Sequence, residues 1–111
     1  MTIIYPSPAT IAEPIMSSDT DDKFYDRADE FIHLANKQCH DIKRGRVSAS
    51  FLYAAARFNA WVSATGFDNG SDMSDKRSEM IDYFVEQYRE MLKENLDDYI
   101  RNFGKYMKKT D

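Results

Sequence analysis

A carboxylate and an imidazole stand three residues apart in the stretch Glu30-Phe31-Ile32-His33. On a helix, that spacing places both groups on one face, as in di-iron bundles, but such a site also takes glutamates from other helices and a second Glu-x-x-His motif. The sequence contains no second motif of this kind. His40 follows His33 by about two helical turns on nearly the same face, so these two histidines could at most form an isolated metal site on the surface. We therefore predict no physiological metal site.

Nucleophilic chemistry has a single candidate thiol, because Cys39 is the only cysteine. It precedes His40, and neighbouring residues on a helix point about 100° apart, so the two side chains do not form a thiol–imidazole dyad. One cysteine also excludes a disulfide within the chain and a zinc site built from several cysteines. The sequence has no glycine-rich phosphate loop. It therefore predicts no catalytic site and no bound cofactor.

The strongest candidates for a site are polar groups inside an apolar segment. Arg57 lies in the middle of residues 48–65, which are otherwise mostly small and apolar. A buried cation is costly unless it is paired. Trp61, one turn on, is close enough for a cation–π contact, and Asp29, Glu30 or Glu86 could supply a carboxylate. Alternatively, Arg57 extends along the surface with its head in water, or it holds an anionic ligand. The candidate ligand site or buried polar cluster comprises Tyr53, Arg57, Asn59, Trp61, Glu86 and Tyr88.

The segment that carries Arg57 is itself predicted to be a helix. It begins at Ser48 or Ala49, with Ser48 as the N-cap, and ends at Thr65, before Gly66. Large apolar side chains occupy one broad side and alanines the other, and a helix that is apolar on all sides is a buried one. We therefore expect residues 48–65 to be the middle helix of the fold, packed between the two other helices or against a partner subunit.

Two further helices are predicted, over residues 22–44 and 74–107. The first follows several N-capping residues and is followed by Gly45, which we expect to end it in the left-handed conformation. The second has an apolar stripe and no proline. Residues 1–20 hold all three prolines and form an arm, either flexible or extended on the helices or on a neighbouring subunit. The sequence thus predicts an all-α fold: a three-helix antiparallel bundle over residues 21–108, with a long C-terminal helix and a proline-containing extended N-terminal arm.

Charge argues against nucleic acid as a partner, and interrupted hydropathy argues against a membrane. The net charge is −4, and the main basic cluster is the turn Lys43-Arg44-Gly45-Arg46, which we interpret as cations at a helix C-terminus. A DNA-recognition helix presents polar and basic side chains, whereas residues 48–65 present alanine and phenylalanine. Pro6, Pro8, Glu13 and Pro14 interrupt the N-terminal apolar residues, so we expect neither a signal peptide nor a membrane span. We expect a cytoplasmic protein.

Three segments together resemble a known family. They are DRADEFIHLAN at residues 26–36, the segment 47–60 that contains YAAARFNA, and the segment 83–99 that contains YFVEQYR and NLDDY. In these segments the chain resembles a small bacterial family catalogued as domain of unknown function 3144, over about residues 22–107. The resemblance implies a bacterial cytoplasmic protein and no particular activity.

The apolar faces indicate what the chain does. The stripe over residues 74–107 drifts, from a centre near Phe84 and Tyr88 toward Ile100 and Met107, which suggests that its two halves face different neighbours. We therefore predict a non-enzymatic helical interaction module that self-associates, as a homodimer, or docks a protein partner. The alternative is a binder of a small anionic ligand in an aromatic-lined pocket near Arg57.

Overall fold

The computed structural model describes residues 21–108 of the 111-residue chain, and this range forms five helices and no strand. The helices are α2 (Phe24–Gln38), α3 (Arg44–Ala64), α4 (Gly70–Asp75), α5 (Arg77–Arg101) and α6 (Phe103–Tyr106). The all-helical fold predicted from the sequence is confirmed. The arm predicted for residues 1–20 lies outside the described residues. Within the described range, no helix combines the length and apolar character that crossing a membrane requires.

The boundary between the first two helices differs from the prediction. Helix α2 ends at Gln38 and α3 already begins at Arg44, so Gly45 lies in the first turn of α3. No described glycine has a positive φ, and Gly45 therefore does not end a helix in the left-handed conformation. The chain changes direction at Lys43, whose ψ of 136° is extended and breaks the helical path. Lys43, rather than Ser48, is the N-cap residue of α3.

The predicted long C-terminal helix is three helices in the structure. Asn69 starts α4, because its side-chain oxygen accepts a hydrogen bond from the Asp72 backbone N–H at 2.9 Å. Lys76 separates α4 from α5 with φ −105° and ψ 5°, outside the helical range. Asn102 separates α5 from α6 in a similar way, and its side chain donates to the Asp98 backbone oxygen at 3.1 Å. Such side-chain bonds compete with the helical ladder, which accounts for a break without proline or glycine.

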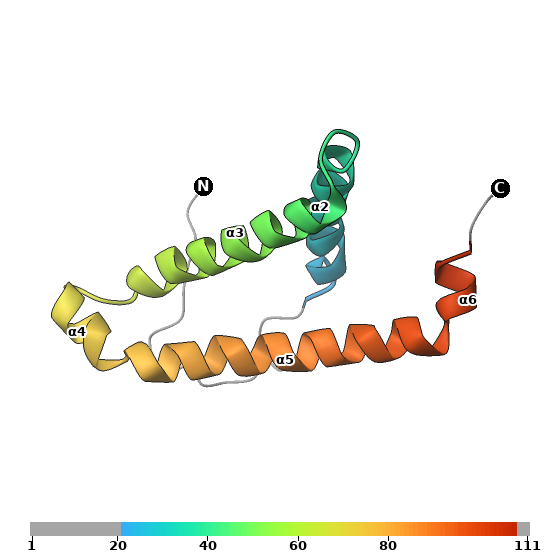
Figure 1. Ribbon diagram of the computed structural model, residues 1–111. Helices are drawn as coiled ribbons and strands as arrows, with labels where there is room; N and C mark the ends of the chain where they lie inside the picture. Colours follow the sequence, from blue (N-terminus) through green and yellow to red (C-terminus); the bar gives the residue numbers. More distant parts are fainter. Residues whose placement is uncertain (1–20, 109–111) are drawn as a thin grey trace.

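The helices form an open arrangement rather than a closed bundle. Figure 1 shows α3 and α5 running in opposite directions, joined through α4 at one end, with α2 crossing α3 near its other end. The rings of Phe31 on α2 and Phe51 on α3 approach to 6.4 Å. The radius of gyration is 16.7 Å, whereas a compact chain of this length has about 13 Å. The predicted three-helix antiparallel bundle is therefore not confirmed.

Very little of this single chain is buried. The buried hydrophobic side chains are Val47, Val62 and Met80, and the only buried polar one in the described range is Ser63. Three of these four belong to the end of α3 and the start of α5, on either side of α4. The core is therefore a corner where the two long helices meet. Helix α3, predicted to be buried on all sides, is instead mostly exposed.

Candidate functional site

The aromatic side chains predicted around Arg57 point away from the core of the single chain. Tyr53 precedes the buried Val62 by nine residues, which places it about 180° from Val62 around the axis of α3. Tyr53 is 70% exposed and Trp61 is 50% exposed. Trp61 contacts the ring of Phe58 at a centroid distance of 5.7 Å. Within residues 21–108, the Arg57 side chain has no ion pair, hydrogen bond or cation–π contact.

The other predicted members lie on different faces. Asn59 is half-buried on α3, and Tyr88 is half-exposed on α5. Glu86 is on the charged side of α5, where one of its carboxylate oxygens lies 3.7 Å from Nε of Arg89. Among the described residues, no hydrogen bond, ion pair or ring contact joins any two of the six predicted side chains. These contacts do not bring the six side chains together into a ligand site. A ligand site near Arg57 therefore stays a prediction.

The structure also locates the candidate metal ligands, the single cysteine and the basic turn. Within the described range, no three His, Cys, Asp or Glu side chains gather in a way that could hold a metal ion. Cys39 is exposed at the end of α2, not on a buried stripe. The basic turn stands at the N-terminus of α3, with Arg44 and Arg46 in its first turn. Their interpretation as cations at a helix C-terminus was wrong, because α3 starts earlier than the sequence indicated.

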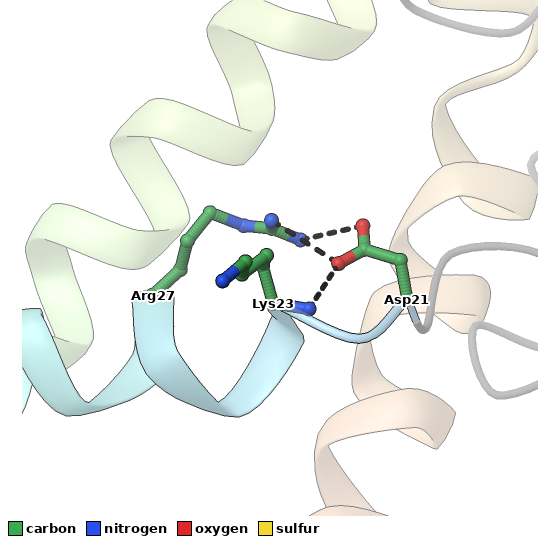
Figure 2. Close-up of polar contacts among 3 residues, drawn as sticks. All are labelled: Asp21, Lys23 and Arg27. Carbon is green, nitrogen blue, oxygen red and sulfur yellow. Dashed lines mark hydrogen bonds and ion pairs between the residues drawn. The ribbon is translucent and has the colours of Figure 1, made fainter.

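An exposed polar cluster fixes the start of α2 (Figure 2). Asp21 accepts a hydrogen bond from the Lys23 backbone N–H at 2.8 Å, and its second carboxylate oxygen lies 3.0 Å from the Arg27 guanidinium. The hydrogen bond from Arg27 is the main reason why the pKa of Asp21 falls below its ordinary value of 3.8, and the bond from Lys23 adds to it. The Asp21 and Arg27 side chains are about half exposed, so the cluster orders the chain that enters α2 rather than doing chemistry.

A second polar cluster joins α5 to α6. The Tyr106 hydroxyl donates to the Asp98 carboxylate at 3.1 Å, and the Asn102 amide donates to the same carboxylate at 2.9 Å. Hydrogen bonding to Asp98 raises the pKa of Tyr106 above its ordinary value. The Tyr106 ring also lies 4.8 Å from that of Tyr99 on α5. These contacts fold α6 back on the end of α5, and no sequence motif indicated them.

Helix α5 has two apolar faces. The first contains the buried Met80 and the half-buried Phe84 and Met91, which recur at helical spacing. Ile81 follows Met80 by one residue, which turns its side chain by about 100°. It begins a second face, in which every side chain is between 42% and 53% exposed. We call this face the α5 stripe, and it consists of Ile81, Val85, Tyr88, Leu92, Leu96 and Tyr99.

One border of the α5 stripe is charged in a regular order. Four exposed charged residues follow each other along it at helical spacing: Asp82, Glu86, Arg89 and Lys93. The first two are acidic and the last two are basic, so the border changes sign at its centre. The opposite border of the stripe meets the first apolar face. The sequence predicts a drift between the two halves of this stripe, whereas the two apolar faces lie side by side along α5, and the drift stays a prediction.

The segments that build these surfaces are also the ones that relate the chain to known proteins. A family model described as "Protein of unknown function (DUF3144)" matches residues 24–100. The chain belongs to the DUF3144 family. The match begins with α2 and ends one residue before the end of α5, so the α5 stripe lies within the DUF3144 region and α6 lies outside it. Neither the curated proteins nor the solved structures contain a match to this DUF3144 chain.

Proposed function

We propose that this protein is a non-enzymatic helical interaction module that associates with a second copy of itself. The observation that carries the proposal is the imbalance between its core and its surface. Within the described range three hydrophobic side chains are buried, while twenty large hydrophobic ones are between 39% and 71% exposed. Single exposed apolar residues are ordinary on a protein surface, but contiguous apolar patches mark interaction sites.

Self-association explains why α5 carries an exposed apolar stripe. A chain of this length needs a sizeable core to be stable alone. The corner around Met80 provides only a small one, and a second copy would cover apolar side chains that the single chain leaves in water. The proposal places the module in the bacterial cytoplasm, as the sequence resemblance implies.

The test is the mass of the full chain in solution over a wide concentration range. Sedimentation equilibrium, with native mass spectrometry as a second method, should give a dimer whose fraction rises with concentration. The purification should avoid metal affinity, so that any added mass comes from a ligand acquired in the cell. A chain that stays monomeric up to about 1 mM, where even weak association would be seen, would overturn self-association.

The binding of a small anion near Arg57 would be the competing result. Its signature is persistent extra mass on the purified chain, lost in an Arg57→Ala variant whose free energy of unfolding is unchanged. That outcome would overturn the proposed interaction module and identify the protein as a ligand-binding protein. A dimer without added mass supports the proposal made here.

A further inference from the structure

We propose that the α5 stripe is the dimer interface, and that the α5 helices of two copies pair antiparallel across it. This inference rests on the proposed self-association and names the surface and the orientation that would produce it. Three observations carry it: the position of the stripe on the helix, its area, and the order of charges along its border.

The α5 stripe has the form of a helix-pairing surface. Its six members alternate at three and four residues, apart from one step, as in the seam of a coiled coil. From Ile81 to Tyr99 it extends about 27 Å along the helix. Met80 is buried on the other apolar face of α5, and at the C-terminal end of the stripe the Tyr99 ring lies 4.8 Å from that of Tyr106 on α6. The stripe members from Ile81 to Leu96 are at least 42% exposed, so they are available without any change in the fold of the single chain.

The exposed area is enough for a specific dimer. Each of the six side chains is about half exposed and so offers roughly 100 Å² of surface. Two copies would then cover about 1,200 Å², which is the lower end of the range for stable protein–protein interfaces. Contacts from the charged border would add to this area. The other exposed large apolar residues lie on α2, α3 and α6, near the end of α5 (Ile100) and outside the helices (Ile42 and Met107), and they form no run of this length in one helix.

The charged border favours an antiparallel orientation. When two identical helices pair antiparallel about a two-fold axis, each border faces the same border of the other copy. An axis close to Tyr88 then sets Asp82 opposite the partner's Lys93, and Glu86 opposite the partner's Arg89. All four pairs across the axis have opposite charges. A two-fold axis one residue nearer the N-terminus, midway between residues 86 and 87, brings Val85 to the partner's Tyr88 and Ile81 to the partner's Leu92. The charges and the apolar layers therefore agree on the antiparallel orientation and place the axis within about one residue of each other.

A matched pair of leucine substitutions tests the surface. Leu92 and Leu34 are both exposed helical leucines, at 42% and 55%, and only Leu92 belongs to the α5 stripe. Leu92→Glu should raise the dimer dissociation constant by about 100-fold or more, because it places a charge in an apolar interface. Leu34→Glu should change it by less than about threefold. Far-UV circular dichroism should show unchanged helix content in both variants, which separates dissociation from unfolding.

A charge swap tests the orientation. Asp82→Lys should weaken the dimer by about tenfold, because it then faces the partner's Lys93. Combining Asp82→Lys with Lys93→Asp restores opposite charges across the two-fold axis and should return the dissociation constant to within about threefold of the original. A double variant that stays as weak as the single ones would overturn the antiparallel pairing.

The outcomes separate this inference from the proposed function. A dimer that survives Leu92→Glu overturns the α5 interface and leaves self-association standing. Dissociation by Leu92→Glu alone, together with recovery in the charge swap, supports both surface and orientation. An original chain that is monomeric at every concentration overturns both proposals together.

Discussion

Truncating Met80 measures how much the small core contributes to stability. Met80 is 8% exposed at the start of α5, so almost all of its side chain is out of water. Met80→Ala removes three heavy atoms beyond Cβ, which is worth about 2.5 kcal/mol at roughly 0.8 kcal/mol for each buried methylene-sized group. Cavity formation could add to this cost, but the corner is open at its sides and can collapse. We therefore expect a loss of about 2 to 3 kcal/mol, at the lower end for buried methionine.

That loss is large for a domain of this size. It should lower the melting temperature by about 10 to 20 °C, since about 1 kcal/mol shifts a domain of this length by 4 to 8 °C. Urea unfolding followed by far-UV circular dichroism would give the free energy directly, at a protein concentration low enough to exclude association.

Met107 provides the matched control, because it is the same residue type at 50% exposure just after α6. Met107→Ala should change the free energy of unfolding by less than about 0.5 kcal/mol. Equal losses for the two variants would refute the assignment of the core to the corner between α3 and α5.

Three further changes address single interactions. The Ser63 side chain is 2% exposed, and its hydroxyl has no hydrogen-bond partner among residues 21–108; Ser63→Ala should therefore raise the free energy of unfolding by about 1 kcal/mol in urea titrations, and a clear decrease would contradict this. Asn69→Ala should lower it by about 1 kcal/mol through loss of the α4 cap, whereas Asn69→Ser, which keeps a capping oxygen and adds no charge beside Asp72, should retain most of it. Because the folded pKa of Asp21 is below 3.8, its contribution is complete above the unfolded value and disappears as the pH falls through the folded one. An NMR titration of the Asp21 carboxyl carbon should therefore give a midpoint below 3.8, and Arg27→Gln should move that midpoint up; an unchanged midpoint in Arg27→Gln would contradict the ion pair.

The sequence predicts helices well where side-chain chemistry marks their ends. The turn around Gly66 and Asn69 was visible as a cluster of turn-forming residues, and α3 ends one residue before the predicted end. The breaks at Lys43 and Asn102 carry neither glycine nor proline at the residue itself. The break at Lys43 is an extended backbone, and the break at Asn102 accompanies a side-chain hydrogen bond to the Asp98 backbone oxygen. Neither feature changes the apolar periodicity of the sequence, so the sequence did not indicate these breaks.

The candidate site was harder to predict than the helices. Apolar periodicity shows which faces of a helix avoid water, but it does not say whether the same chain or another one covers them. The sequence therefore leaves open whether Arg57 and Trp61 form an enclosed cluster or lie at the surface, and in this chain Trp61 contacts Phe58 and is half exposed. The two faces of α5 merge into one broad apolar stripe in the sequence, and the burial of Met80, with the half-buried Phe84 and Met91, separates them in the structure.

The local character of the packing has a consequence for how the chain folds. Helix α2 packs on α3, and α5 packs on α4 and α6, so these contacts join elements that follow each other along the chain. Such a low contact order closes only short loops, and domains of this kind fold within microseconds to milliseconds. Pairing of two chains is bimolecular and slows as the protein is diluted. Each newly made chain would then complete its helices first and keep its apolar stripe open until a second chain arrives, so expression level would set how long that surface is exposed.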